Sequence, residues 1–241
     1  MSGIDIGLVA SENSIVDGVR ASQNATAGIR VGHNTLVTRC VTSDNTFGIL
    51  SGVACVITDC TVRHSTGWGL DGGFGGVVTN CTSYENDTNG IVVNVGTVSN
   101  CNASHNGHNG IQASSGSTII GCTAQDNDQN GFWANSTTIF RDNSSINNTD
   151  AGIYVFGDAC RLEGNNCVGN GTGIEIDGDA NYIVRNVCTD NTINFDLAEN
   201  NRFGAIIDHT ISSTIPVVGN GAGSAMGTTD PWANFANTSF P

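Results

Sequence analysis

The sequence predicts an all-β protein: a single right-handed parallel β-helix, a solenoid of about 9–10 coils of about 21 residues each. Three observations predict this fold. A glycine followed by an apolar residue recurs every 20 or 21 residues, a column of Cys and Asn lies about twelve residues later, and a column of Asn lies five residues beyond that. Self-similarity at such a period is typical of solenoids, in which each repeat contacts only its neighbours.

The glycine column marks the start of the first strand in each coil. Its members are Gly28, Gly48, Gly69, Gly90, Gly110, Gly131, Gly152 and Gly173. The residues that follow alternate between apolar and outward-facing positions, as in a strand with one buried face. A single coil cannot bury its apolar side. Stacking coils about 4.8 Å apart pairs every strand with its copies and builds a continuous core.

The second and third columns define the later turns of each coil. The second column is Val19, Cys40, Cys60, Cys81, Cys101, Cys122, Asn143, Asn165 and Asn186, and the third is Asn24, Asn45, Ser65, Asn86, Asn106, Asn127, Asn148, Asn170 and Asn191. Stacked Asn side chains satisfy turn backbone groups that would otherwise be buried without partners. These columns therefore predict an asparagine ladder.

The cysteines are expected to form a ladder of free thiols rather than a disulfide framework. Those of the second column project in the same direction from successive coils, which suits disulfide torsions badly. Free cysteine packs as a small apolar residue, and the pair Cys167 and Cys188 is interpreted in the same way. Cys55 and Cys160 occupy an earlier position and could be more exposed.

The two ends of the chain differ. The β-helix is predicted over residues 1–207, and residues 208–241 are predicted to form a C-terminal capping tail, because the phase is lost and all three prolines lie there. Terminal repeats must cover the open core end. The N-terminus enters the repeat at once, so its exposed edge either is protected by an upstream segment or pairs with another chain as a homo-oligomer.

Charge and hydropathy exclude several classes of partner. The formal net charge is −14, all eight basic residues are arginines, and nucleic acid as a partner is therefore excluded. An anionic polysaccharide would also be repelled unless the arginines cluster or a cation intervenes. No apolar run is long enough to span a membrane. The start of the sequence lacks the basic and apolar layout of a signal peptide, so either the protein is cytoplasmic or the sequence is that of a mature or trimmed chain. The expected location is extracellular or at the cell surface.

The glycine, Cys/Asn and Asp-Asn rhythm resembles that of the right-handed parallel β-helix repeat proteins of the pectate-lyase-like superfold. The resemblance covers roughly residues 3–207. It implies the fold and a set of activities that includes polysaccharide lyases, glycosidases, uronate epimerases and phage tailspikes, as well as non-enzymatic surface proteins. A shared fold does not select among them.

One candidate site lies on the outward positions of the first strands. It comprises Trp133, Tyr154, Phe156, Glu175, Asp177 and Asp196, which the period places over four coils. Aromatic faces beside carboxylates suit a sugar ring, which needs stacking and hydrogen-bond acceptors. The alternative is that these aromatics only cover the strand surface or pack beneath the tail. Two of the acids would form a glycosidase pair only if their separation fits.

A second candidate site lies on the third strand of each coil and its turn. A lyase or epimerase needs a cation for the uronate carboxylate and acid/base groups nearby, and Arg63, Tyr84 and His105 are catalytic candidates of these types. A metal is an alternative occupant of the same turns. Its candidate ligands are His64, Glu85, His105 and His108. Solvated polar turns are the third interpretation.

No cofactor is required by the sequence, although Asp126-x-Asp128 and Asp177-Gly178-Asp179 could collect Ca²⁺. Coils of nearly uniform length lack the inserted loops that build a cleft. The expected function is therefore an extracellular or surface β-helix that contacts polysaccharide or another glycan without turning it over. Catalysis by a lyase, epimerase or glycosidase stays open. The alternative is a structural protein whose coils stack end to end between chains.

Overall fold

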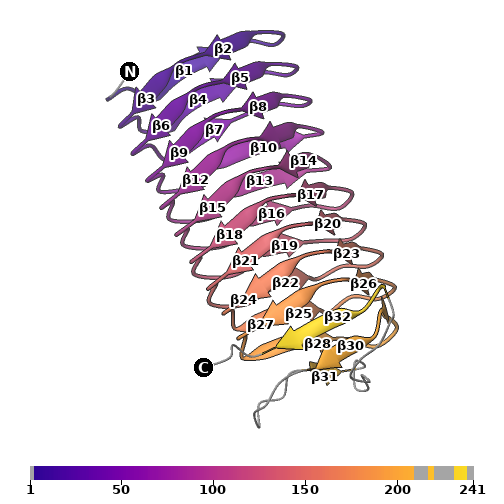
Figure 1. The fold of residues 1–241 in the computed structure, drawn as a ribbon. Coiled ribbons are helices and arrows are strands. Elements are labelled where there is room, and N and C mark those ends of the chain that lie inside the picture. Colours follow the sequence, from indigo (N-terminus) through magenta and orange to yellow (C-terminus); the bar gives the residue numbers. More distant parts are fainter. Residues whose placement is uncertain (1–2, 209–216, 220–230, 238–241) are drawn as a thin grey trace.

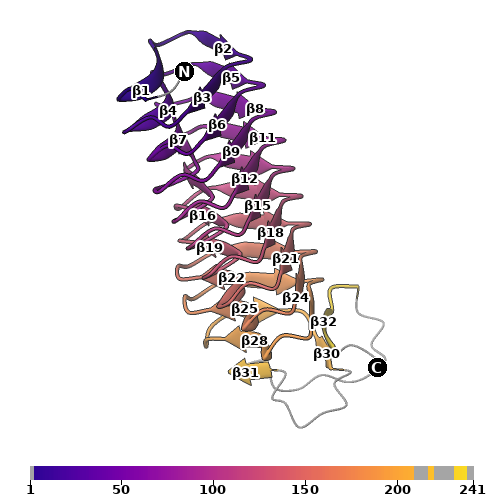
Figure 2. The same cartoon turned by 90° about the vertical axis from the view of Figure 1, so that its left-hand side faces the viewer.

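The computed structural model describes residues 3–208, 217–219 and 231–237. Every regular element in these residues is a β-strand, and the strands form three parallel sheets that wind as one stack of coils (Figure 1). Figure 2 shows the coils following one another along a single axis. The predicted all-β solenoid is confirmed, and the described residues contain no helix that could cross a membrane.

The first sheet contains the strands that follow the glycine column. Its order is β1 (Ile6–Ala10), β4 (Ala27–Val31), β7 (Phe47–Leu50), β10 (Leu70–Phe74), β13 (Ile91–Asn94), β16 (Ile111–Ala113), β19 (Phe132–Ala134), β22 (Ala151–Val155), β25 (Thr172–Ile176), β28 (Ile193–Leu197) and β31 (Val217–Gly219). Each strand pairs with the equivalent strand one coil away, so residues of equal phase stand in register.

The second sheet contains the shorter strands that follow the next turn. Its order is β2 (Ile15–Asp17), β5 (Leu36–Thr38), β8 (Val56–Thr58), β11 (Val77–Thr79), β14 (Thr97–Ser99), β17 (Thr118–Ile120), β20 (Ile139–Arg141), β23 (Arg161–Glu163), β26 (Tyr182–Val184) and β29 (Arg202–Phe203). The middle residue of most of these strands points inward, and the two flanking residues face outward.

The third sheet follows the Cys/Asn column. Its order is β3 (Arg20–Ser22), β6 (Val41–Ser43), β9 (Thr61–Arg63), β12 (Thr82–Tyr84), β15 (Asn102–Ser104), β18 (Thr123–Gln125), β21 (Ser144–Ile146), β24 (Asn166–Val168), β27 (Val187–Thr189), β32 (Asn234–Asn237) and β30 (Ile206–Asp208). Strand β32 lies between β27 and β30, so a late segment of the chain is inserted between two earlier ones (Figures 1 and 2).

Apolar side chains from all three sheets fill the interior. Ile29, Ile57 and Val62 illustrate the contribution of each sheet, and all three are fully buried. Larger side chains occupy the interior further along, where the rings of Phe132 and Phe140 meet edge to face with centroids 6.1 Å apart. Every coil adds to this one core, so each coil is stabilised by its neighbours in the stack.

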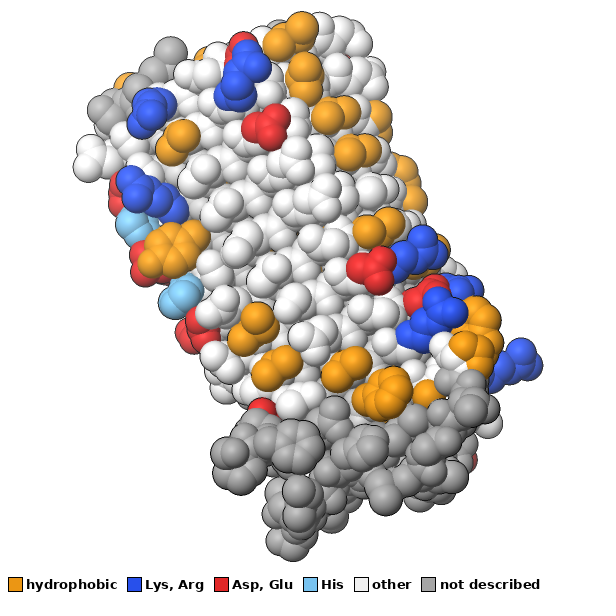
Figure 3. All heavy atoms as spheres, in the orientation of Figure 1, with side chains coloured by type: hydrophobic (Ala, Val, Ile, Leu, Met, Phe, Trp, Pro, Cys, Tyr) orange, Lys and Arg blue, Asp and Glu red, His pale blue; other side chains and the backbone are white. Residues whose placement is uncertain are grey.

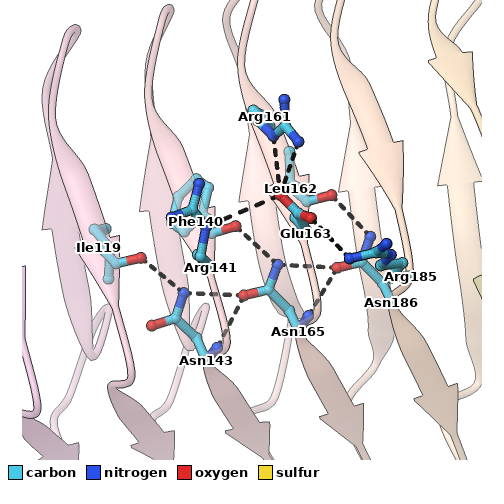
Figure 4. Close-up of polar contacts among 10 residues, drawn as sticks. All are labelled: Ile119, Phe140, Arg141, Asn143, Arg161, Leu162, Glu163, Asn165, Arg185 and Asn186. Carbon is cyan, nitrogen blue, oxygen red and sulfur yellow. Dashed lines mark hydrogen bonds and ion pairs between the residues drawn. The ribbon is translucent and has the colours of Figure 1, made fainter. Parts of the chain in front are cut away.

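The predicted asparagine ladder is present in the turns. Asn165 Oδ1 accepts hydrogen bonds from the backbone N–H of Asn143 at 3.0 Å and from its Nδ2 at 2.9 Å, and Asn165 Nδ2 donates to Asn186 Oδ1 at 2.9 Å (Figure 4). Asn165 Nδ2 also donates to the carbonyl of Phe140 at 3.2 Å. Each side chain therefore satisfies buried groups in its own coil and in a neighbouring one.

All nine cysteines are free and buried, as expected for the second column. The thiols occupy the same ladder position as the asparagines: Cys60 Sγ accepts from the N–H of Cys40 at 3.4 Å, and Asn143 Oδ1 accepts from the N–H of Cys122 at 2.9 Å. The expectation that Cys55 and Cys160 are more exposed is wrong, because their exposed fractions are 1% and 2%. Both thiols occupy a buried turn position and donate to backbone carbonyls.

The described parts of the tail extend the sheets. Strand β31 pairs with β28, and Asn234 in β32 takes the ladder position next to Asn186, whose Nδ2 donates to Asn234 Oδ1 at 3.1 Å. Most of residues 208–241 lies outside the described residues. The prediction of a separate capping tail therefore stays a prediction.

Candidate functional site

The predicted strip on the first sheet is a register column of four adjacent strands. Trp133 pairs with Tyr154, Tyr154 with Glu175, and Glu175 with Asp196. Neighbouring strands lie about 4.8 Å apart, so these outward side chains form one file along the axis. Phe156 and Asp177 follow the ends of β22 and β25, and Phe156 is 58% exposed.

Tyr154 is held in place by an acid from the next coil. Its Oη donates a 2.6 Å hydrogen bond to Asp177 Oδ2. Desolvation and the hydrogen bond to Asp177 raise the pKa of Tyr154 to about 12. The phenol is therefore a fixed hydrogen-bond donor at neutral pH, on the strand position that pairs with Trp133.

Glu175 lies between like charges. Burial raises the pKa of its carboxyl, and the charges of Asp177, Asp196 and Asp150 raise it further. A carboxyl in this position resists ionisation more than a fully exposed one does.

A shallow depression of about 520 Å³ adjoins this part of the strip. Its lining residues are Asn130, Thr149, Asp150, Tyr154, Gly171, Thr172, Glu175, Thr192 and Ile193. Hydroxyl, amide and carboxyl groups therefore converge beside one aromatic ring, which is a combination that suits a sugar. The depression includes Tyr154 and Glu175, whereas Trp133, Phe156, Asp177 and Asp196 lie outside its lining.

The second candidate site lies where strands β9, β12 and β15 of the third sheet end, on an exposed surface. His64 Nε2 lies 2.6 Å from Glu85 Oε2, and Tyr84 Oη donates to Glu85 Oε1 at 2.5 Å. The rings of Tyr84 and His105 meet edge to face with centroids 5.4 Å apart. Arg63 pairs in register with Tyr84. In Figure 3 the pale blue histidines lie at the left-hand edge, with acidic side chains beside them.

Backbone conformation explains why these side chains share an edge. His64, Glu85 and His105 all have φ between 51° and 55°, in the left-handed region that allows the chain to turn out of the third sheet. The hydrogen bond to Glu85 raises the pKa of Tyr84, and the same bond, with that to His64, lowers the pKa of Glu85. The phenol is consequently a weaker acid than usual and stays protonated at neutral pH.

The predicted metal ligands do not gather around one point. Within the described ranges, no three His, Cys, Asp or Glu side chains are arranged to hold a metal ion. His64 and Glu85 contact each other, His105 lies 3.7 Å from Asp126, and His108 forms no ion pair in this part of the chain. The metal interpretation gains no geometric support here and stays a prediction, as does Ca²⁺ binding.

The structure adds a depression that the sequence analysis missed, at the N-terminal end of the first sheet. It measures about 590 Å³ and is lined by Val9, Ala10, Arg30, Val31, Gly32, His33, Phe47, Leu50, Ser51, Gly52, Trp68 and Asp71. The Phe47 and Trp68 rings meet edge to face at 5.9 Å, and burial raises the pKa of Asp71. The available signal was an aromatic residue directly before the column glycine in two successive coils, Phe47 before Gly48 and Trp68 before Gly69.

Comparisons with known proteins agree with the architecture. Residues 49–193, more than half of the chain, match the family model described as right-handed β-helix region. No match was found among curated proteins. Among solved structures, the A-module of mannuronan C-5 epimerase AlgE6 from Azotobacter vinelandii has a TM-score of 0.71 at 14% identity, covering 95% of this chain and 74% of that chain.

Two further solved structures share this fold. Pectate lyase Pel9A has a TM-score of 0.60 at 15% identity, covering 90% of this chain and 70% of its own. Dettilon tailspike protein has a TM-score of 0.57 at 13% identity, covering 97% and 63%. At these identities the likeness concerns the fold alone.

Proposed function

Because the chain belongs to the right-handed β-helix family, we propose that it is an extracellular or cell-surface protein that binds polysaccharide along the first sheet without turning it over. The observation that carries this proposal is the register column Trp133, Tyr154, Glu175 and Asp196 beside a hydroxyl-lined depression. Similar folds that are by name a mannuronan epimerase and a pectate lyase support polysaccharide as the ligand class. A periplasmic alginate epimerase of the same fold supports a location outside the cytoplasm.

The side chains at the ends of the third-sheet strands are poorly suited to turnover. Tyr84 is hydrogen-bonded to Glu85, and the pKa of its phenol is raised, which opposes a role as base. The side chains of His64, Glu85 and His105 are 41%, 42% and 50% exposed, so water is not excluded from them. Acid/base catalysis gains from positioned groups in a site closed to water, and this edge is open.

The experiment is a depletion assay with the purified protein on polygalacturonate, polymannuronate and a neutral glucan, with ultraviolet absorbance followed for unsaturated products. We expect depletion without rising absorbance. The double substitution Trp133→Ala/Tyr154→Ala should weaken binding about tenfold or more, since it removes two ring contacts. Phe74→Ala, which removes an exposed aromatic from the same sheet outside the strip, is the matched control and should bind as the parent does.

Two outcomes would overturn parts of this proposal. Rising absorbance on a uronate polymer would establish lyase activity and direct attention to Arg63, Tyr84 and His105. Unchanged binding by the Trp133→Ala/Tyr154→Ala protein would show that the strip is not the binding surface.

A structural role is the second candidate function. Strands β1, β2 and β3 each have a single sheet neighbour among the described residues, and Val9 and Ile15 are 68% and 74% exposed. Unpaired strands with exposed apolar side chains favour edge-to-edge association. This role predicts concentration-dependent oligomers in sedimentation that Val9→Lys/Ile15→Lys abolishes. A monomer at all concentrations would exclude it.

A further inference from the structure

Four of the eight arginines lie on one part of the second sheet. Arg141 ends β20, Arg161 begins β23, Arg185 directly follows β26, and Arg202 begins β29. Figure 3 shows blue side chains gathered at the right-hand edge, around the position of β23 and β26 in Figure 1, beside red and orange ones. In a chain with a net charge of −14, this arginine patch is a local reversal of sign.

Glu163 holds three of these arginines together (Figure 4). Arg161 donates to Glu163 Oε2 from Nε at 3.1 Å and from Nη2 at 2.8 Å, and Arg185 Nη1 lies 3.4 Å from Glu163 Oε1. Arg141 Nε is 3.9 Å from Glu163 Oε2. The Glu163 side chain is only 14% exposed, whereas those of the three arginines are 42–46% exposed. The carboxylate is therefore covered, and the guanidinium groups face solvent.

One carboxylate cannot neutralise the positive charge of the arginine patch. Arg202 takes part in no ion pair within the described residues, and its position is also exposed. Among the ion pairs of the described residues, the acid that contacts the arginines of the patch is Glu163. One carboxylate therefore pairs with three guanidinium groups. The surface can therefore attract a negatively charged ligand.

Aromatic rings lie between the arginines. The Arg161 guanidinium carbon is 5.4 Å from the Tyr182 ring centroid, and that of Arg185 is 4.2 Å from the Trp232 centroid. Tyr182 and Trp232 are 37% and 41% exposed. The rings orient the guanidinium groups by cation–π contact and leave part of their own surface accessible.

Register gives the patch a period along the axis. Arg161 pairs with Tyr182, and Tyr182 pairs with Arg202, so a cation, a ring and a second cation stand on three successive coils. With a strand spacing of about 4.8 Å, the two arginine positions lie about 10 Å apart with the ring between them. A polymer running along the axis would meet an acid-binding position, a stacking position and a second acid-binding position.

We propose that the arginine patch binds a uronate-bearing polysaccharide, with Arg161 and Arg202 pairing with carboxylates and Tyr182 stacking on the sugar ring between them. Guanidinium groups match carboxylates bidentately, and the partly exposed Tyr182 ring offers a sugar ring a surface to stack on. Duplex DNA carries a charge every ~1.7 Å, and the acidic remainder of this chain opposes such a polyanion. The inference extends the proposed function to a second face and names its ligand class.

The test compares Arg161→Gln/Arg202→Gln with Arg20→Gln/Arg39→Gln, which removes the same charge from exposed positions near the N-terminal end. Binding to polygalacturonate, polymannuronate, a neutral glucan and single-stranded DNA is measured at low salt with a chelator present, so that divalent cations cannot bridge. We expect uronate binding to weaken about tenfold or more in the first variant, since it loses two charge-assisted contacts, and less than about twofold in the control. Added salt should weaken uronate binding by the parent.

Each other outcome contradicts the inference. Equal losses in both variants, or DNA binding as tight as uronate binding, would show attraction by charge alone. Unchanged uronate binding in Arg161→Gln/Arg202→Gln, with loss in Trp133→Ala/Tyr154→Ala, would leave the proposed function standing and remove the patch from it. Binding of no polymer at all would reject both. If loss of Arg161 unfolds the chain, Arg202→Gln alone carries the comparison, because Arg202 has no ion pair to disrupt within the described residues.

Discussion

Tyr154 donates a 2.6 Å hydrogen bond to Asp177, a residue 23 positions later that directly follows strand β25 in the next coil. The contact joins an aromatic ring of the strip to an acid in the neighbouring coil. It therefore fixes the orientation of the ring without any contribution from a ligand.

Tyr154→Phe should destabilise the protein by about 1 kcal/mol or less, since one partly exposed hydrogen bond is lost. Because the pKa of Tyr154 is raised to about 12, the phenol donates throughout the neutral range. Denaturant unfolding at pH 7 measures the difference. Tyr182→Phe is the control, since its hydroxyl forms no hydrogen bond within the described residues and its loss should change little. A larger effect of Tyr182→Phe would contradict the role given to the Asp177 contact.

Glu175→Gln should stabilise the protein at pH 7 and leave its stability unchanged near pH 4. Burial and then Asp177, Asp196 and Asp150 raise the pKa of Glu175. A carboxyl with a raised folded-state pKa stabilises the fold while it is protonated, and this contribution is lost as pH rises through that pKa. Glutamine cannot ionise, so it avoids the loss. Solvent screening keeps the gain on the order of 0.5 kcal/mol.

The free energy of unfolding as a function of pH tests this prediction. The exposed acid Glu199 supplies the control Glu199→Gln, which makes the same chemical change outside the cluster of acids around Glu175. If Glu175→Gln were neutral or destabilising at pH 7, the clustering of like charges around Glu175 would have no energetic consequence.

Asn165→Ala should cost about 3 kcal/mol or more of stability. The substitution leaves the buried N–H and Nδ2 of Asn143 and the carbonyl of Phe140 without their partner, and each unsatisfied buried group costs about 1–3 kcal/mol. Asn102→Ala removes an exposed Asn from β15 and should cost less than about 0.5 kcal/mol. Similar costs for the two variants would show that the ladder contributes no more than surface polarity.

The thiols should resist alkylation in the folded protein and react fully in denaturant. Burial raises the pKa of Cys160 to about 11, and the hydrogen bond with Cys101, together with burial, raises that of Cys81 to about 12. Mass spectrometry after iodoacetamide treatment at pH 8 should find none of the nine thiols labelled in the native state. Rapid labelling of native Cys81 would show that the turns open.

The raised pKa values of the buried thiols also make the stability of the protein depend on pH. Thiols with raised folded-state pKa values contribute stability that is complete below the unfolded value of about 8.5. That contribution is lost as pH rises through the folded values of about 11–12. The midpoint of denaturant unfolding should therefore fall above about pH 9.

The period explains what the sequence could predict. Because Trp133, Tyr154, Glu175 and Asp196 share one phase of the repeat, their register followed from the spacing alone. The contact between Tyr154 and Asp177 did not, since it depends on how a side chain leans between coils. Burial of Cys55 and Cys160 was missed because a turn position was equated with an exposed one.

Contacts between segments of different phase could not be predicted either. Asn234 joins the ladder 48 residues after Asn186, because β32 inserts between β27 and β30. The same return of the chain brings Trp232 over Arg185. Neither contact corresponds to a feature that recurs with the period of the repeat.

The most direct test of polysaccharide binding along the strip uses the three tryptophans, because Trp68, Trp133 and Trp232 lie at three different surfaces. Proteins that retain one tryptophan each, with the other two replaced by Phe, are titrated with the polymer that depletes the parent protein. The account predicts a saturable change in the fluorescence of Trp133. A silent Trp133 in a protein that still binds the polymer would contradict it, and a response from Trp68 alone would place the site in the N-terminal depression.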